Sequence, residues 1–211
     1  MRRAIAACVL LAGCAQSGGW PPPAQMTASS VAGAAAPARA DSCPPPGTRI
    51  ARRRVDNGAA LATTTYVQAG QNAPCVVTFG GTTRGIDMLA TRTWGGDPQR
   101  LARDLAPLFP LEPGKSVTFT QIGDSIRGHS FQYRYTVDVL RRERITVPAG
   151  TFDAFVVRVT EQGQLENRFR EERAVWLAAG SHAPLRMQRR TTRGIGTDTP
   201  DWEATSISVP R

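Results

Sequence analysis

The sequence predicts an all-β domain, built as a single antiparallel, strongly curved sheet or half-barrel with one short helix. Residues 131–139 alternate strictly between apolar and polar side chains, the pattern of a strand with one buried and one wet face. Many further short apolar segments follow at close spacing, and only one segment has helical periodicity. The 211 residues are enough for one such domain, with residues left over for processing and a linker.

The first 13 residues have the layout of a signal peptide. Arg2 and Arg3 precede an apolar stretch over residues 4–12, which is too short to span a bilayer because that takes roughly 20 residues. The stretch ends in Leu-Ala-Gly-Cys at residues 11–14, which resembles the lipobox of bacterial lipoproteins. The resemblance implies that Cys14 becomes the N-terminus and carries acyl chains such as palmitate. The alternative is an ordinary secretory signal with a chance cysteine.

The same resemblance implies a place in the bacterial cell envelope. Two or more acyl chains give stable membrane anchoring, and Ala15, in place of an aspartate after Cys14, favours the outer membrane over the inner one. The protein is then expected to face the periplasm. Nucleic acid is therefore not an expected partner, although the net charge is +9.

A linker and then a folded domain follow. Residues 14–46 form the acylated cysteine and a linker dominated by Ala, Pro, Ser and Gly, which we expect to be disordered because it has no apolar period. The β domain is expected over residues 47–211. Cys43 and Cys75 remain after Cys8 and Cys14 are assigned to the signal and the anchor. An even pair in an oxidising compartment predicts a disulfide; metal ligation is the less favoured alternative.

Strands are predicted along the whole domain. Asp97 and Pro98 favour the start of the one helix, with leucines at 101, 105 and 108 and prolines at its end. The Asp56-Asn57-Gly58 segment is typical of a hairpin turn. The expected strands cover residues 49–55, 61–68, 75–79, 86–92, 116–122, 131–139, 155–159, 170–178, 184–191 and 202–209.

A second resemblance covers roughly residues 105–190. V-P-A-G-T-F at residues 147–152, F-P-L-E-P-G-K-S at 109–116, and V-W-L at 175–177 with P-L-R-M at 184–187 resemble segments of a bacterial envelope domain family of unknown function. The family is distantly similar to periplasmic lipoprotein carriers of the LolA and LolB type, which implies a bent antiparallel sheet around an apolar hollow. The V-P-A-G turn itself carries no nucleophile or base, so we interpret it as a strand connection.

No catalytic centre or cofactor site emerges from the sequence. His129 and His182 lack metal-ligand spacing and are interpreted as solvated loop residues, and no G-x-S-x-G motif surrounds a serine. Glu161, Glu166, Glu171 and Glu172 alternate with arginines, which favours a salt-bridged outer face over a glycosidase carboxylate pair. We therefore expect no enzymatic activity, no metal and no cofactor.

Two functions remain open. In the first, the domain is a non-catalytic binding module for an apolar or acyl-containing envelope component, and the candidate lining consists of Phe131, Tyr133, Tyr135, Phe155 and Val157. An ordinary packed core explains the same residues equally well. In the second, the domain is a scaffolding protein of an outer-membrane complex that uses its surface. Arginine forks suit lipid phosphate or envelope glycan, and the candidate anion contacts are Arg141, Arg142, Arg189 and Arg190.

Overall fold

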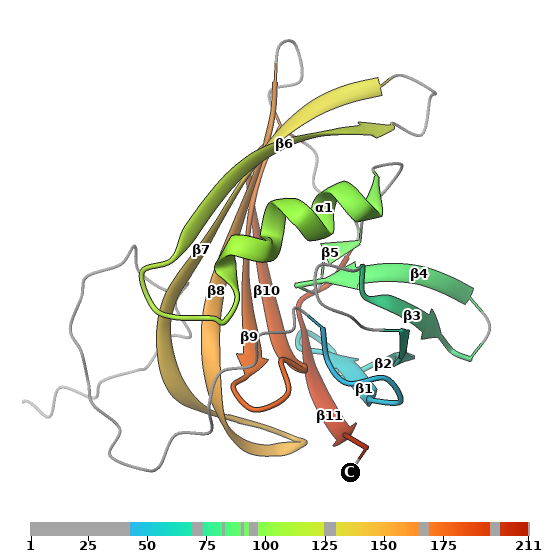
Figure 1. Ribbon diagram of the computed structural model, residues 1–211. Helices are drawn as coiled ribbons and strands as arrows, with labels where there is room; N and C mark the ends of the chain where they lie inside the picture. Colours follow the sequence, from blue (N-terminus) through green and yellow to red (C-terminus); the bar gives the residue numbers. More distant parts are fainter. Residues whose placement is uncertain are drawn as a thin grey trace, which may run out of the picture.

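A computed structural model describes residues 43–68, 74–81, 83–89, 91–92, 97–124, 130–164, 169–194 and 199–210. The expected signal peptide, Cys14 and the linker up to residue 42 lie outside the described residues. The described chain forms a mostly β structure with a single short α-helix (Figure 1). Its elements are β1 (Arg49–Arg54), β2 (Ala60–Gln68), β3 (Val76–Phe79), β4 (Thr83–Met88), β5 (Thr91–Arg92), α1 (Pro98–Leu105), the 3-10 turn η1 (Ala106–Leu108), β6 (Ser116–Asp124), β7 (Ser130–Val147), β8 (Gly150–Gly163), β9 (Arg170–Ala178), β10 (Pro184–Arg193) and β11 (Trp202–Ser208).

The strands form one antiparallel, curved sheet of eleven strands in the order β5-β4-β3-β2-β1-β11-β10-β9-β8-β7-β6. Each strand pairs with its sequence neighbour, except that β1 pairs with β11 and the chain crosses from β5 at one edge to β6 at the other. The sheet is not closed, since β5 and β6 remain its edges. This confirms the predicted fold class for the β domain.

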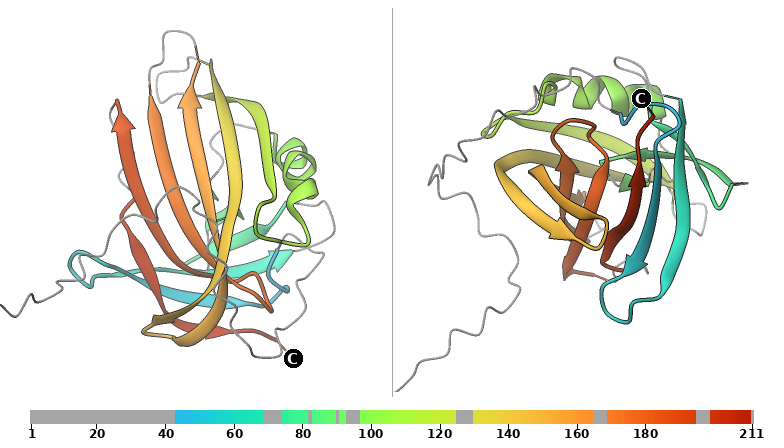
Figure 2. Two further views of the ribbon diagram at one scale, coloured as in Figure 1. Left: turned by 90° about the vertical axis from the view of Figure 1, so that its left-hand side faces the viewer. Right: turned by 90° about the horizontal axis from the view of Figure 1, so that it is seen from below.

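The crossing segment contains α1, which lies across the open side of the curved sheet in both the front view and the end-on view (Figures 1 and 2). The helix begins as predicted: the Asp97 side chain accepts a hydrogen bond from the Gln99 backbone N–H at 2.9 Å, and Pro98 occupies the first turn. Leu101, Ala102 and Leu105 form its buried side. The ends of β6 to β10 extend past the helix toward the top of Figure 1.

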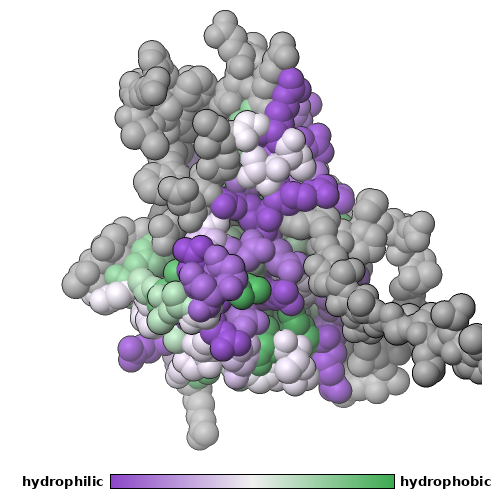
Figure 3. All heavy atoms as spheres, turned by 180° about the vertical axis from the view of Figure 1, so that it is seen from behind, coloured by the Kyte–Doolittle hydropathy of each residue, from purple (hydrophilic) through white to green (hydrophobic). Residues whose placement is uncertain are grey.

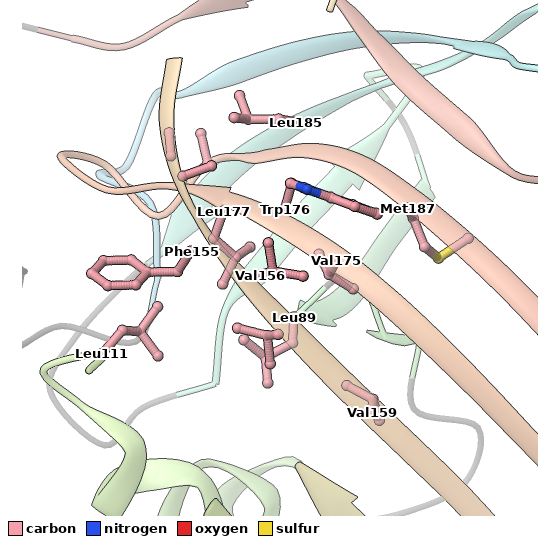
Figure 4. Packing of buried hydrophobic residues seen from close by; sticks show 14 of the residues in the cluster. Leu89, Leu111, Phe155, Val156, Val159, Val175, Trp176, Leu177, Leu185 and Met187 are labelled. Carbon is pink, nitrogen blue, oxygen red and sulfur yellow. The ribbon is translucent and has the colours of Figure 1, made fainter. Parts of the chain in front are cut away.

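The inner face of the sheet and the buried side of the helix share one hydrophobic core. Alternation along β8 points Phe155, Val157 and Val159 into this core, and all three are at most 3% exposed. Figure 4 shows the packing of this region, to which β9 contributes Val175 and Leu177. Leu108 and Leu111 come from the chain just after α1 and are also buried. The core therefore joins the helix segment to the central strands.

The long β7–β8 hairpin ends in the V-P-A-G turn. Strand β7 stops at Val147 and β8 starts at Gly150, which confirms the predicted strand connection. Gly150 has φ +133, a conformation that side chains disfavour. The Ala149 backbone N–H donates to the Ala204 carbonyl of β11 at 3.0 Å, so the hairpin tip reaches across to a strand that lies three places away in the sheet.

The predicted disulfide is present between Cys43 and Cys75, whose Cα atoms are 5.5 Å apart. Both cysteines are at most 1% exposed. Cys43 and Pro44 are buried, and the Thr48 backbone N–H donates to the Pro45 carbonyl at 3.0 Å. The segment that carries Cys43 therefore packs with the domain just ahead of β1.

Two elements differ from their sequence-based outlines. The segment 86–92 is split into β4 and β5, and Leu89 between them has φ +54. Strand β7 continues beyond Val139 to Val147, and its pairing with β8 shifts register between Val139 and Arg141. Such an irregularity changes which side chains point inward, so the apolar–polar alternation that marks residues 131–139 does not continue in the same phase.

Candidate functional site

The inner face changes character toward the end of the sheet at which β8 finishes. Beyond Val137 of β7 and Val159 of β8, the next inward positions carry tyrosines on β7 and Glu161 on β8. Pairing register places Tyr135 opposite Glu161, and Glu161 opposite Glu171. Polar groups in adjacent register rows therefore cross the inner face, and we call this set the inner polar belt; Gln121 lies one row beyond Tyr135, opposite Tyr133. Its members are Gln121 of β6, Tyr135 of β7, Glu161 of β8, Glu171 and Arg173 of β9, and Arg189 and Thr191 of β10.

Ion pairs link the charged members of the belt. Arg173 Nη2 lies 2.7 Å from Glu161 Oε2, and Arg173 Nε lies 3.7 Å from Glu171 Oε1. Arg189 Nη1 lies 3.6 Å from the other oxygen of Glu171. The side chains of these four residues are only 2–17% exposed. The positive charges of two arginines are thus balanced by the negative charges of two glutamates in a largely buried part of the inner face.

Burial changes the proton affinity of two belt residues. Loss of solvent raises the pKa of Glu171, although Arg173 and Arg189 act in the opposite direction. Loss of solvent also raises the pKa of the Tyr135 phenol, and the charge of Glu161 adds to the effect. Tyr135 therefore stays protonated, and its hydroxyl is a donor for the neighbouring Glu161 carboxylate.

Aromatic rings lie next to the belt. The Tyr135 ring stacks on Phe119 of β6, with centroids 5.3 Å apart. The Tyr133 ring contacts Phe169 edge-on at 6.5 Å.

Gln121 pairs with Tyr133 across the β6–β7 ladder and is only 7% exposed, yet its Nε2 has no hydrogen-bond partner within the described part of the chain. A buried amide donor without an acceptor costs free energy, so this position requires an explanation.

The candidate lining residues from the sequence fall into two zones. Phe155 and Val157 lie in the packed core at 3% and 0% exposure, so no water-sized space adjoins Val157. Tyr135 belongs to the belt, Tyr133 lies beside it on β7, and both are half-buried. Phe131 lies on β7 opposite Gly123, but its side chain is outside the described residues. The register places Tyr133, Tyr135, Phe155 and Val157 on the inner face.

The candidate anion contacts are not brought together. Arg141 and Arg142 belong to β7, whereas Arg189 and Arg190 belong to β10. Arg141 pairs with Glu143 at 2.7 Å, and Arg142 pairs with Asp153 at 3.0 Å while lying 5.5 Å from the Phe155 ring.

On β10, the two neighbouring arginines point to opposite faces. Arg189 points inward to Glu171, and Arg190 contacts Glu172 at 3.3 Å. Each of the four candidate arginines therefore has a carboxylate partner.

Two sequence-based interpretations are wrong. Glu161 and Glu171 belong to the inner face rather than to a salt-bridged outer face; only Glu172, paired with Arg170 and Arg190, matches that description. Glu166 lies outside the described residues. His182 is not solvated: it is 2% exposed, and its ring lies 5.5 Å from Phe109. His129 also lies outside the described residues.

Parity along the strands is the signal that could have found the belt. Glu161 has the same parity as Val157 and Val159 in β8, and Glu171 has the same parity as Val175 in β9. Since side chains on one face of a strand recur every second residue, these glutamates point where the valines point. The alternation of Glu with Arg in the sequence hid this phase, because both faces carry charges.

The outer face of the sheet has the polarity of a solvated surface. The back view shows a mainly hydrophilic surface with smaller hydrophobic patches in its lower half (Figure 3). In the described ranges, no group of three or more His, Cys, Asp or Glu side chains is arranged to hold a metal ion. In the part of the chain that the structure describes, no helix is long and apolar enough to cross a membrane.

One known family matches the region of the chain that contains this site. Residues 102–199 match a family described as a protein of unknown function, DUF3108. The match spans just under half of the chain. The DUF3108 region contains β6 to β10, and with them all members of the inner polar belt.

Similar solved structures include two proteins described as lipoproteins. The hypothetical lipoprotein YmcC from Escherichia coli K12 shares 9% identity, with 81% of this chain and 89% of that chain covered and a TM-score of 0.48. A protein from Parabacteroides distasonis also shares 9% identity, with 82% and 97% covered and a TM-score of 0.35. No curated protein matches this chain.

Proposed function

We propose that this chain is a lipoprotein of the bacterial cell envelope, anchored through acylated Cys14 and facing the periplasm from the outer membrane. Its β domain is a non-catalytic module that binds an apolar or acyl-containing envelope component on the inner face of the sheet. The anchor rests on the Leu-Ala-Gly-Cys motif at residues 11–14. The binding role rests on the graded polarity of the inner face.

The gradient suits an amphiphile. The inner face changes from aliphatic residues such as Val157 to a row in which the stacked Phe119 and Tyr135 rings lie on the same level as the ionic groups around Glu171. An acyl chain gains free energy on apolar surface, whereas its head group needs polar partners. In this structure, buried leucines of α1 complete the core against the sheet. The proposal therefore includes an outward shift of α1 when the acyl chain enters.

Native mass spectrometry of the full acylated chain, released from detergent micelles, tests the binding role. We expect an added mass of a few hundred daltons that organic extraction removes. Tyr133→Ala, on the inner face, should weaken this binding roughly fivefold or more because an aromatic contact is lost. Arg134→Ala, the next residue on the exposed outer face, is the matched control. A bare acylated chain, even after incubation with excess envelope lipid, would refute the binding module.

The anchor has its own test. Cys14→Ser removes the only sulfur that the lipobox offers for diacylglycerol, so the intact mass should lack the acyl groups and the lipobox cleavage should fail. Wild-type chain should fractionate with outer membranes. A mass that changes after Cys14→Ser only by the difference between cysteine and serine would show that Cys14 is not acylated.

An interaction role is the second candidate, and one observation favours it. Strand β6 is an open edge of nine residues, and Ile122 on it is 58% exposed. Open edges can pair with a strand of another protein. Ile122→Lys should abolish cross-linking to such a partner while leaving amphiphile binding unchanged. Cross-linking that persists in the variant would argue against this edge.

A further inference from the structure

We propose that the inner polar belt selects an amphiphile with an uncharged, hydrogen-bonding head, bound through an ester carbonyl, and rejects heads that carry a phosphate. This inference rests on the proposed binding function and names its ligand class. Three features of the belt carry it: its charge balance, the buried amide of Gln121, and the location of that amide on an edge strand.

Charge balance argues against a phosphate. Arg173 contacts both Glu161 and Glu171, and Arg189 contacts Glu171. Both cations are therefore engaged by carboxylates within the belt. A phosphate placed here would bring a negative charge into a site that is only 2–17% exposed and already neutral, and a buried charge without a partner is strongly disfavoured.

The Gln121 amide supplies the hydrogen-bond preference. Its side chain belongs to the inner face, and Nε2 is buried without an acceptor within the described residues. An amide N–H needs an oxygen acceptor, and an ester carbonyl provides one without adding charge. A ligand carbonyl oxygen at this point would accept a hydrogen bond from a donor that the protein leaves unsatisfied. Ester ligands would therefore gain binding free energy.

The position of Gln121 provides a route for the ligand. Strand β6 is an edge of the sheet, and among the described strands it pairs with β7 alone. Gln121 lies opposite Tyr133, one step along the inner face from the stacked rings of Phe119 and Tyr135. A head group at Gln121 would thus direct its chain past these rings toward the apolar core.

Three probes with the same 18-carbon monounsaturated chain test the selection: 1-monooleoylglycerol, its alkyl-ether analogue, and oleoyl lysophosphatidic acid. They are offered in competition to the full acylated chain, and bound species are counted by native mass spectrometry. We expect the ester to bind roughly 2- to 10-fold better than the ether, the range that one neutral hydrogen bond gives. The phosphate probe should bind least.

Variants of two glutamines on neighbouring strands provide the specific readout. Gln121→Leu should lose the ester–ether discrimination while still binding the ether. Gln132→Leu, an exposed residue on the outer face of β7, should keep it. The thermal midpoint of Gln121→Leu should not fall, because replacing an unsatisfied buried amide by an apolar group of similar size removes a cost; this also shows that the variant folds.

The outcomes separate the two proposals. Equal binding of all three probes, a preference for the phosphate, or discrimination that survives in Gln121→Leu would overturn the ligand class but leave the binding function standing. Binding of no probe, together with no ligand from a lipid extract, would overturn both.

Discussion

The carboxylate of Glu171 is the most deeply buried charge of the belt. Its side chain is 2% exposed and lies between Arg173 and Arg189. The arginines favour the ionised form, but the loss of hydration outweighs them, so the pKa is raised. Glu171 therefore binds its proton more tightly in the folded than in the unfolded chain, and folding becomes less favourable as this proton is lost.

The first prediction concerns the pH dependence of stability. Because the folded pKa of Glu171 is raised, its contribution is fully present below the ordinary pKa of about 4.5 and is lost as pH rises through the raised value. The glutamine of Glu171→Gln does not ionise, so the variant does not lose this stability as pH rises. The free energy of unfolding of the variant, relative to wild type, should thus increase from pH 4 to pH 8 in urea titrations.

Glu172→Gln is the matched control, since it changes the same group at the adjacent outer-face position. If the free energy of unfolding of Glu171→Gln relative to wild type stays constant or decreases as pH rises, the raised pKa of Glu171 is contradicted.

At the scale of elements, the β7–β8 hairpin is the largest paired unit of the sheet. Its strands have 18 and 14 residues, and its tip hydrogen-bonds to β11 through Ala149. The turn depends on Gly150, whose φ is +133. A Cβ at this position would meet the Phe152 ring at 3.5 Å, which is ordinary contact, so backbone strain is the cost of a side chain here.

The second prediction follows from that strain. Gly150→Ala should lower the free energy of unfolding by about 1–3 kcal/mol, measured by urea denaturation with circular dichroism. The unfolding should stay cooperative because the core is untouched. A variant as stable as the wild type would show that the turn tolerates a side chain and that glycine is not required.

The elements were predictable where local signals suffice. Asp97 and Pro98 begin α1, the turn at Gly58 joins β1 and β2, and the alternation over 131–139 predicts the start of β7. The inward direction of Glu161 was missed although it has the parity of Val157 and Val159, because charged residues in this part of the sequence occur at both parities and obscure the apolar–polar alternation. The burial of His182 depends on Phe109, more than 70 residues away in the sequence.

At the scale of the molecule, the order of strands was not predictable from local sequence. Strand β1 pairs with β11, and Arg53 contacts Glu203 across this pair at 2.7 Å. No turn motif marks a pairing between residues so far apart. The same pairing leaves β5 and β6 as edges, with the α1 segment between them. The curved, open form of the domain was predictable only as one architecture compatible with many short antiparallel strands.

The third prediction concerns the disulfide that ties the beginning of the domain to β3. The bridge joins residues 32 positions apart. Replacing both Cys43 and Cys75 by Ala should lower the free energy of unfolding by roughly 3–4 kcal/mol, since the unfolded chain regains the freedom of the closed loop. Reduction of the wild type should give a similar loss in urea titrations. Unfolding midpoints that do not change would contradict a structural role for the bridge.

The bridge also sets how the domain bears mechanical load. A pull on the chain ahead of Cys43 would otherwise peel β1 from its partners β2 and β11, one hydrogen bond after another. Cys43 is bonded covalently to Cys75, directly before β3. Tension therefore passes around β1 into a strand two places further along the sheet. A domain held by its N-terminal segment can thus be dragged by that segment without its first strand being unzipped.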